Sequence, residues 1–405
     1  MSKVIQVAGG LVVLALSVRT ALLMEPGLDY FSDAGASIDA LVRRDFEGFF
    51  ASQPLMGSFS LFLRAPFVAT VFHSSESTVY LAGALPCVIA ALVLGMVLGR
   101  VAAERGASEA VQGLVAGLAV INPITFRALH WGHPEELLTA ALCVGAVIAA
   151  LRDRHVLAGV LLGLALASKQ WAVLAVLPVF LAATDRRVLI ALLAGGLAAA
   201  LTVPMYLAAP SAFESVAQGA AGQRSGGTWT TPWSVWWAIA EVTDVPGRGL
   251  MYVAPAWVGQ ISHPLIVALA PVLAGLLWLR KDRRRDDALL LLALLFLLRC
   301  VLDQWNNDYY HAPFLLSLLA WEVMRFGGFP YRTLAFSLLH ALSFYPQQSQ
   351  IFLGSFEHAP ALNAVYLLWV LPLVGYLASQ LIAPNAHRAA WVRLSLAPRA
   401  DDAPT

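Results

Sequence analysis

VYLAGALPCVIAALVLGMVLG is the sequence of residues 79–99, an uncharged stretch that ends at Arg100. As a helix rising about 1.5 Å per residue, it can cross the bilayer's hydrocarbon core, which is about 30 Å thick. Similar apolar runs recur between residues 4 and 383. Hydrophobic residues make up 59% of the 405 positions and charged residues 13%. This composition is more apolar than that of a water-soluble protein of this size. The sequence therefore predicts an all-α polytopic membrane protein.

Hydropathy predicts twelve crossings joined by polar segments. None of these segments is large enough for an independent water-soluble domain. We therefore expect a single membrane domain over residues 1–383, followed by a cytoplasmic tail, 384–405. The predicted crossings are 4–23, 79–99, 110–126, 136–151, 156–168, 171–184, 188–209, 261–279, 288–302, 312–325, 332–346 and 361–382.

The positive charges give these crossings an orientation. With the N terminus inside, 17 of the 26 Lys and Arg residues lie on the cytoplasmic side, among them the cluster 280–285. This distribution follows the positive-inside rule, and the even number of crossings returns the C terminus inside. We expect a plasma-membrane protein with both termini in the cytoplasm and membrane lipids as neighbours. Its net charge of +1 gives no reason to expect a nucleic-acid partner.

Two predicted hairpins have polar turns at their outer ends. The legs of the hairpin between Arg154 and Arg186 hold only about twelve apolar residues each, roughly 18 Å of helix. Its apex, Lys169-Gln170-Trp171, is therefore expected below the outer surface. Polar backbone at such a depth is tolerated only where it lines a cavity or is covered by protein. The hairpin 110–151 has a comparable turn, containing Arg127, His130, His133, Glu135 and Glu136.

The longest loop, residues 24–78, follows the first crossing and faces outward. Ser32 is a fair N-cap for a helix that starts at Asp33. The stretch 59–67 mixes aromatic residues with Arg64, which is typical of a helix in the membrane interface. We therefore expect two interfacial helices in this outer loop. Asp29 and Asp33 stand next to the first crossing, where a lipid head group would arrive.

Three motifs resemble known membrane glycosyltransferases. Leu28-Asp29-Tyr30-Phe31-Ser32-Asp33-Ala34-Gly35 resembles the first outer loop of polyprenyl-phosphate-mannose-dependent mannosyltransferases of the GT-C type, including the GPI mannosyltransferase. It departs from them in having a single Leu-Asp in place of an Asp-x-Asp pair. Asn122-Pro123 with HWGHPE (130–135), and ASKQW (167–171), are similar to bacterial members of glycosyltransferase family 87. The resemblance implies two juxtamembrane helices and a catalytic carboxylate in that loop.

An inverting sugar transfer needs two kinds of group. A carboxylate takes the proton of the acceptor hydroxyl, and a cation or dipole stabilises the departing phosphate. Asp29 or Asp33 can supply the carboxylate. The outward cations are Lys169, Arg127 and Arg224, with Lys169 first because a buried cation is costly unless an anion pairs with it. The alternative for Lys169 is snorkelling or an ion pair with Glu135 or Glu136.

Other polar and aromatic residues are candidates for lining the substrate site. The tryptophan-rich segment 218–237 is either an interface belt or a platform for sugar rings. Asp308 and His311 would share a face if a helix starts there, and an ordinary outer loop is the alternative. His130 and His133 lack an HExxH pattern, so hydrogen bonding is favoured over metal binding. The sequence requires no cofactor, although a divalent ion is compatible with it. The candidates are His130, His133, Glu135, Gln170, Trp171, Trp229, Asp303, Asp308 and His311.

The nature of the sugar donor follows from what the chain lacks. It has no Rossmann fingerprint and no P-loop, and its predicted cytoplasmic loops are short and basic. A donor that has already crossed on a polyprenyl phosphate is therefore the consistent choice. The predicted function is transfer of a hexose, with mannose favoured, to a lipid or glycan acceptor on the outer face. The alternative is a lipid or glycolipid transporter, although the second half does not evidently repeat the first.

Overall fold

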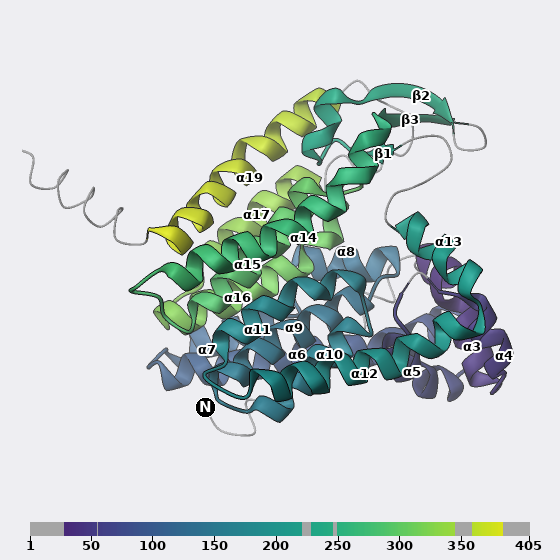
Figure 1. Cartoon of the computed structure of the whole chain (residues 1–405), viewed down its shortest axis with the longest axis horizontal. Coiled ribbons are helices and arrows are strands. Elements are labelled where there is room, and N and C mark those ends of the chain that lie inside the picture. The colour runs from purple at the N-terminus through teal and green to yellow at the C-terminus, as the bar shows by residue number, and fades with distance from the viewer. Residues whose placement is uncertain (1–27, 55, 221–227, 246–248, 345–358, 384–405) are drawn as a thin grey trace, which may run out of the picture.

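The computed structural model describes residues 28–54, 56–220, 228–245, 249–344 and 359–383. Helices dominate the molecule and share one apolar core that runs from Tyr30 to Leu381 (Figure 1). The predicted first crossing, 4–23, and the predicted tail, 384–405, lie outside the described residues. The fold is therefore helical as predicted, within these ranges.

The segment predicted as the first outer loop forms a series of short helices. They are α2 (Leu28–Tyr30), a π-helical turn (Phe31–Gly35), α3 (Ala36–Val42), α4 (Phe46–Ser52) and α5 (Ser58–Ala69). The prediction that Ser32 caps a helix beginning at Asp33 was wrong, because the helix is already formed at Leu28. The Ser32 hydroxyl instead donates to the Asp29 carbonyl at 3.1 Å. The interfacial location of these helices stays a prediction.

A bundle of helices follows. It comprises α6 (Glu76–Glu104), α7 (Glu109–Leu118), α8 (Pro123–Trp131), α9 (Glu135–Leu151), α10 (His155–Leu166), a 3₁₀ turn (Gln170–Ala175), α11 (Val176–Ala182), α12 (Arg187–Ala208) and α13 (Pro210–Ala220). The predicted crossing 110–126 is broken between α7 and α8. The Asn122 side chain accepts a hydrogen bond from the Thr125 amide at 2.8 Å, and Pro123 occupies the first helical position. Both features start a new helix, and they separate α8 from α7.

A small antiparallel sheet interrupts the helices. β1 (Thr228–Thr230), β2 (Glu241–Val245) and β3 (Gly249–Ala254) have the order β1-β3-β2, with a 3₁₀ turn (Val235–Ile239) between β1 and β2. The all-α prediction missed this sheet because its strands are short. Trp233, predicted within a belt or sugar platform, is buried and stacks on Phe344 with ring centroids 4.7 Å apart. Belt and platform both require an accessible ring, so neither describes Trp233.

The last helices complete the bundle. They are α14 (Ala256–Leu279), α15 (Asp287–Leu302), a 3₁₀ turn (Asp308–His311), α16 (Ala312–Phe326), α17 (Tyr331–Phe344) and α19 (Ala359–Ile382). α15 and α16 are buried on nearly every side. Helices that are apolar all round belong in the interior, and these two pack against each other and against α9 and α19 (Figure 1).

Five stretches of described helix are long and apolar enough to cross a membrane: α6, α7 with α8, α12, α14 and α19. This supports the membrane prediction, whereas the number of twelve crossings stays a prediction. The predicted crossings 136–151, 288–302, 312–325 and 332–346 correspond to α9, α15, α16 and α17, which have 14 to 17 residues. Helices of this length reach across the hydrocarbon core only where the bilayer is thin.

Candidate functional site

The turn between α8 and α9 is pressed against the helix that carries Asp29. Gly132 ends α8 with φ of 85°, a left-handed conformation that favours glycine. A Cβ atom on Gly132 would lie 2.6 Å from the backbone nitrogen of Tyr30. Only glycine permits this close approach, which brings His133 next to Asp29.

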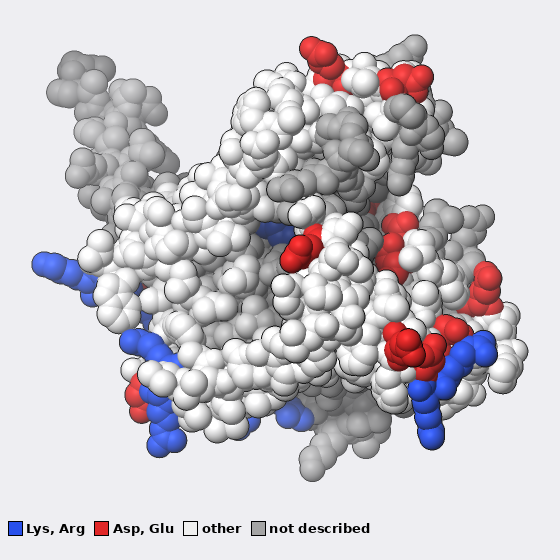
Figure 2. Space-filling view, turned by 45° about the vertical axis from the view of Figure 1, so that its right-hand side comes forward, with Lys and Arg blue, Asp and Glu red and all other residues white. Residues whose placement is uncertain are grey.

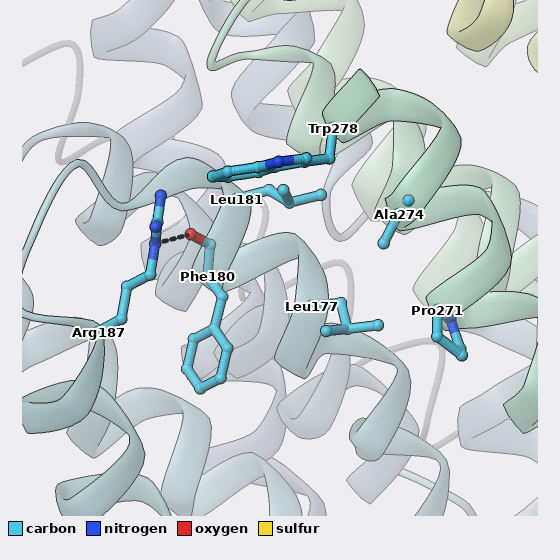
Figure 3. Close-up of a pocket in the computed structure, with 8 residues that line it drawn as sticks. Leu177, Phe180, Leu181, Arg187, Pro271, Ala274 and Trp278 are labelled. Carbon is cyan, nitrogen blue, oxygen red and sulfur yellow. Dashed lines mark hydrogen bonds between the residues drawn. The ribbon is translucent and has the colours of Figure 1, made fainter. Parts of the chain in front are cut away.

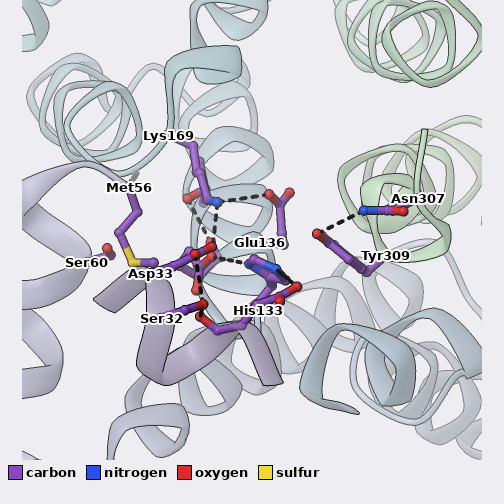
Figure 4. Close-up of polar contacts among 12 residues, drawn as sticks. Ser32, Asp33, Met56, Ser60, His133, Glu136, Lys169, Asn307 and Tyr309 are labelled. Carbon is purple, nitrogen blue, oxygen red and sulfur yellow. Dashed lines mark hydrogen bonds and ion pairs between the residues drawn. The ribbon is translucent and has the colours of Figure 1, made fainter. Parts of the chain in front are cut away.

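Asp29, His133, Glu135 and Lys169 form a continuous series of polar contacts, of which Figure 4 labels His133 and Lys169. Nε2 of His133 lies 3.2 Å from Oδ2 of Asp29, and Nδ1 lies 3.1 Å from Oε1 of Glu135. The same Glu135 oxygen is 3.0 Å from Nζ of Lys169. The Asp29 side chain is 44% exposed and that of Glu135 is 0% exposed. The series therefore leads from an accessible carboxylate into the protein interior.

Asp33 lies one helical turn beyond Asp29. The Ser32 hydroxyl donates to Oδ1 of Asp33 at 3.2 Å. Burial raises the pKa of Asp33 above its ordinary value, and the positive charge of His133 partly opposes this rise. A carboxyl group with a raised pKa is a stronger base once it is ionised.

His133 carries a positive charge at neutral pH. Burial alone would lower the pKa of this imidazole, but the contacts with Asp29 and Glu135 outweigh burial and raise the pKa to about 9. Its ring stacks on Tyr309, with centroids 4.4 Å apart and an interplanar angle of 19°. The ring is thus fixed on its face and at both nitrogens.

Lys169 pairs with two carboxylates at once. Its Nζ atom lies 3.0 Å from Oε1 of Glu135 and 3.3 Å from Oε1 of Glu136, and its side chain is 15% exposed. Trp171 donates from Nε1 to the same Glu136 oxygen at 3.4 Å. The ion pair that the sequence offered as an alternative for Lys169 is therefore present. An ammonium group has three donors, so one N–H remains beyond these two contacts.

The turn that carries Lys169 is fastened to the start of α5. The Gly57 amide donates to the Ser168 carbonyl at 2.9 Å, and the Phe59 amide donates to the Ala167 carbonyl at 3.1 Å. A Cβ atom on Gly57 would lie 2.1 Å from the Ala167 oxygen, so the contact requires glycine. The predicted outer loop and the apex of the short hairpin are thereby joined into one site.

Arg64 is a site residue whose role the sequence did not reveal. The sequence offered it only as the single charge of a predicted interfacial helix, whereas in the structure its side chain is 0% exposed. Its Nη1 atom lies 3.5 Å from Oε2 of Glu135, and its guanidinium group lies over the Tyr30 ring, 4.6 Å from the centroid. A buried cation needs such partners. Arg64 contacts Oε2 of Glu135, whereas His133 and Lys169 contact Oε1, so Glu135 is held at both of its oxygens.

Arg299 was missed as well. It extends from α15 over the rings of Trp171 and Tyr310, with centroid distances of 5.0 Å and 4.6 Å, and its Nη1 atom is 3.9 Å from Oε2 of Glu136. The available signal was an arginine inside the apolar run 288–302, since an ionisable residue in such a run indicates a functional or buried paired site.

Arg127 and Asp308 form an ion pair beside His133. Asp308 is completely buried, and Arg127 is 15% exposed. The two residues predicted to share a face, Asp308 and His311, do lie together, with Nδ1 of His311 3.1 Å from the Asp308 carbonyl. Nε2 of His311 is 3.1 Å from the Tyr366 hydroxyl. His311 is thus enclosed by protein, which makes it a packing residue for Asp308 rather than a lining residue.

The remaining predicted residues that the structure describes make other contacts. Asp303 pairs with His263 at 3.5 Å. Trp229 meets the Trp305 ring edge to face, and His130 meets the Trp131 ring in the same way. Gln170 is exposed next to Lys169, and Arg224 lies outside the described residues.

Figure 2 shows one face of the molecule, which is mostly white, with charged side chains gathered toward its edges and a few of both signs near its middle. Within the described ranges, no group of three or more His, Cys, Asp or Glu side chains could hold a metal ion. The polar groups are instead matched as carboxylates against cations, an arrangement suited to proton transfer and to binding a charged leaving group.

The sequence and the fold were compared with those of known proteins. An archaeal oligosaccharyltransferase from Archaeoglobus fulgidus, solved with an inhibitory peptide and a dolichol-phosphate, aligns with 92% of this chain and 56% of its own, at 11% identity and a TM-score of 0.43. The chain thus spans little more than half of that protein's length. No curated protein matches the sequence. The family model of glycosyltransferase family 87 matches residues 57–302, more than half of the chain. The protein therefore belongs to glycosyltransferase family 87.

Proposed function

We propose that this protein transfers a hexose, with mannose favoured, from a polyprenyl-phosphate donor to a lipid or glycan acceptor on the outer face of the membrane. The observation that carries the proposal is the series Asp29, His133, Glu135 and Lys169. It places an accessible carboxylate and a largely buried ammonium group at the two ends of one hydrogen-bonded system. Family membership supports the transferase over the transporter alternative.

In this proposal Asp29 is the general base. A base must be accessible to the acceptor hydroxyl and held in one orientation, and Asp29 is half-exposed and held by His133. Asp33 is the second candidate, with its raised pKa in its favour. The proton taken from the hydroxyl stays on the carboxylate while the hydroxyl oxygen attacks the anomeric carbon and the bond from that carbon to the phosphate oxygen breaks.

Lys169 and Arg127 are the proposed contacts of the departing phosphate. Lys169 keeps one N–H beyond its two carboxylate contacts, and Arg127 keeps part of its guanidinium group accessible. Charge-assisted hydrogen bonds to a developing phosphate stabilise it strongly where water is excluded. The neighbouring carboxylates hold these cations in place before the donor arrives.

The test is a transfer assay with the purified protein and a radiolabelled polyprenyl-phosphate mannose. Asp29→Asn is expected to lower kcat by roughly 10²- to 10⁴-fold, the usual contribution of a general base. Asp39→Asn is the matched control, because Asp39 is an exposed acid of the same segment that pairs with Arg43 at 3.0 Å. Transfer that survives Asp29→Asn and Asp33→Asn equally would rule out this base. Transfer from a nucleotide sugar instead would rule out the donor class.

A further inference from the structure

A second, separate groove lies between α11, α12 and α14 (Figure 3). It has a volume of about 290 Å³, at the small end for ligand sites and suited to one chain rather than a whole lipid. Its lining is apolar, with Leu177 and Leu181 on one side and Pro271 and Gly275 on the other. The guanidinium group of Arg187 lies at one end, near Trp278.

Two arginines at this end have no acidic partner in the part of the chain that the structure describes. Arg187 donates to the carbonyls of Phe180 at 2.9 Å and Ala183 at 3.0 Å, which fixes its position without neutralising it. Its guanidinium carbon lies 5.3 Å from the Trp278 ring centroid, and that of Arg283 lies 4.0 Å from the same centroid. Among the described residues, no carboxylate lies within ion-pair distance of either arginine. Two positive charges against one ring, with no carboxylate to offset them, would be stabilised by an anion that contacts both.

The walls of the groove face lipid. α12 and α14 are both long and apolar enough to cross a membrane. Their outward side chains are strongly exposed, for example Leu192 at 68%, Val272 at 56% and Leu279 at 77%. From Trp278 to Pro271 the helix rises about 10 Å, so a chain entering beside Trp278 continues toward the bilayer interior. An acyl chain can therefore enter from the side without leaving the membrane.

We propose that this groove binds one acyl chain of an anionic phospholipid, whose phosphate lies at Arg187 and Arg283. The occupant is an anionic lipid because both unpaired charges are positive and lie at the mouth of an apolar groove. It is not the sugar donor, because the transferase site lies elsewhere. His263, which pairs with Asp303 near that site, is about 22 Å along α14 from Trp278.

The test measures which lipid the full chain retains. Protein reconstituted in nanodiscs of phosphatidylglycerol and phosphatidylcholine in equal parts is extracted into mild detergent, and bound lipid is counted by native mass spectrometry. Retained phosphatidylglycerol is expected to exceed phosphatidylcholine. Arg187→Gln should lower it about fivefold, the effect of one arginine near a lipid phosphate. Arg154→Gln, at an exposed arginine outside the groove, should leave it unchanged.

A pair of glycine variants separates filling of the groove from general effects on the helices. A Cβ atom on Gly275 meets nothing within 4 Å, and the same holds for Gly196 on α12, which does not line the groove. Both changes to leucine add the same side chain to an exposed helix position. Phosphatidylglycerol should raise the thermal midpoint of the unaltered protein. Gly275→Leu should lose both this increase and the retention of phosphatidylglycerol, whereas Gly196→Leu should keep both.

Three results would overturn the proposal. The two leucine variants could retain phosphatidylglycerol equally, or phosphatidylcholine could be retained as well as phosphatidylglycerol. The third is displacement of the bound lipid by polyprenyl phosphate together with loss of donor binding in Gly275→Leu, which would show that the groove holds the donor's tail. None of these measurements depends on transferase activity, so the two proposals can fail separately.

Discussion

Nε2 of His133 lies 3.2 Å from Oδ2 of Asp29, although the two residues are 104 positions apart in the chain. The contact couples an accessible carboxylate to a charged imidazole, which is itself held by Glu135. His133→Gln removes the charge and loosens this coupling. We expect kcat for transfer to fall by about tenfold to a hundredfold, with little change in KM, because Asp29 is no longer held in position.

The control for this change is His73→Gln, at an exposed histidine between α5 and α6. Steady-state kinetics with a labelled lipid-linked donor provide the measurement. A loss confined to KM would show that His133 contributes to binding and does not position the base.

The pH dependence of activity should reveal the charge on His133. Its pKa is raised to about 9 from 6.5, so the imidazole is protonated at neutral pH and loses its charge as the pH rises through about 9. Because the pKa is raised on folding, its contribution to stability is complete below pH 6.5 and disappears as the pH rises through about 9. We expect an alkaline decline in kcat/KM near pH 9, with a parallel fall in the thermal midpoint, and neither change in His133→Gln. An unchanged decline in that variant would assign it to another group.

Mutations of Lys169 and of the carboxylates around it should have non-additive effects on the free energy of unfolding. Lys169→Met leaves Glu135 and Glu136 without their shared cation, and we expect the free energy of unfolding to fall by about 3 kcal/mol, as when a buried pair loses one partner. Adding Glu136→Gln should recover about 1 kcal/mol or more of that loss, measured as a double-mutant cycle. The exposed pair Arg43 and Asp39 is the reference, with an expected coupling below about 1 kcal/mol. Strict additivity at Lys169 and Glu136 would contradict the pairing.

Gly132 offers a test of the packing that brings Asp29 to His133. Gly132→Ala places a Cβ atom 2.6 Å from the Tyr30 backbone, so α2 must move and Asp29 with it. Gly106→Ala is the matched control, because Gly106 has nearly the same φ, 82° against 85°, but an added Cβ meets nothing within 4 Å. Both variants should lose about 1 kcal/mol from left-handed strain, whereas only Gly132→Ala should also lose transfer activity. Equal activity in the two variants would contradict the role assigned to this contact.

Much of the site was accessible from local sequence signals. Lys169 was identified because a cation at the apex of a short apolar hairpin must find an anionic partner, with the donor phosphate favoured and an ion pair with Glu135 or Glu136 as the alternative. Asp29 was selected from its place after an apolar run and from a motif resemblance. These are inferences about single segments, which the sequence permits because the cost of burying a charge is a local quantity, and the catalytic roles of both residues stay predictions.

What the sequence did not reveal depends on which segments touch. Arg64 looks like an interfacial residue in its own helix, and only the packing of α5 against α3 and α6, together with the contact to Glu135, explains its burial. The three strands were missed for a similar reason, since β1 pairs with β3 some 24 residues later and no single segment is long enough to indicate a sheet. Pairings of this kind are set by tertiary contacts that outweigh local propensity.

The Arg64–Glu135 pair also constrains how the protein is made. α5 leaves the ribosome well before α9, so the Arg64 guanidinium group has no carboxylate partner for the time needed to synthesise 71 further residues. Placing that charge in lipid alone would be costly. The N-terminal helices must therefore wait at the membrane surface or beside the insertion machinery until α9 arrives, and their docking is a late event in biogenesis.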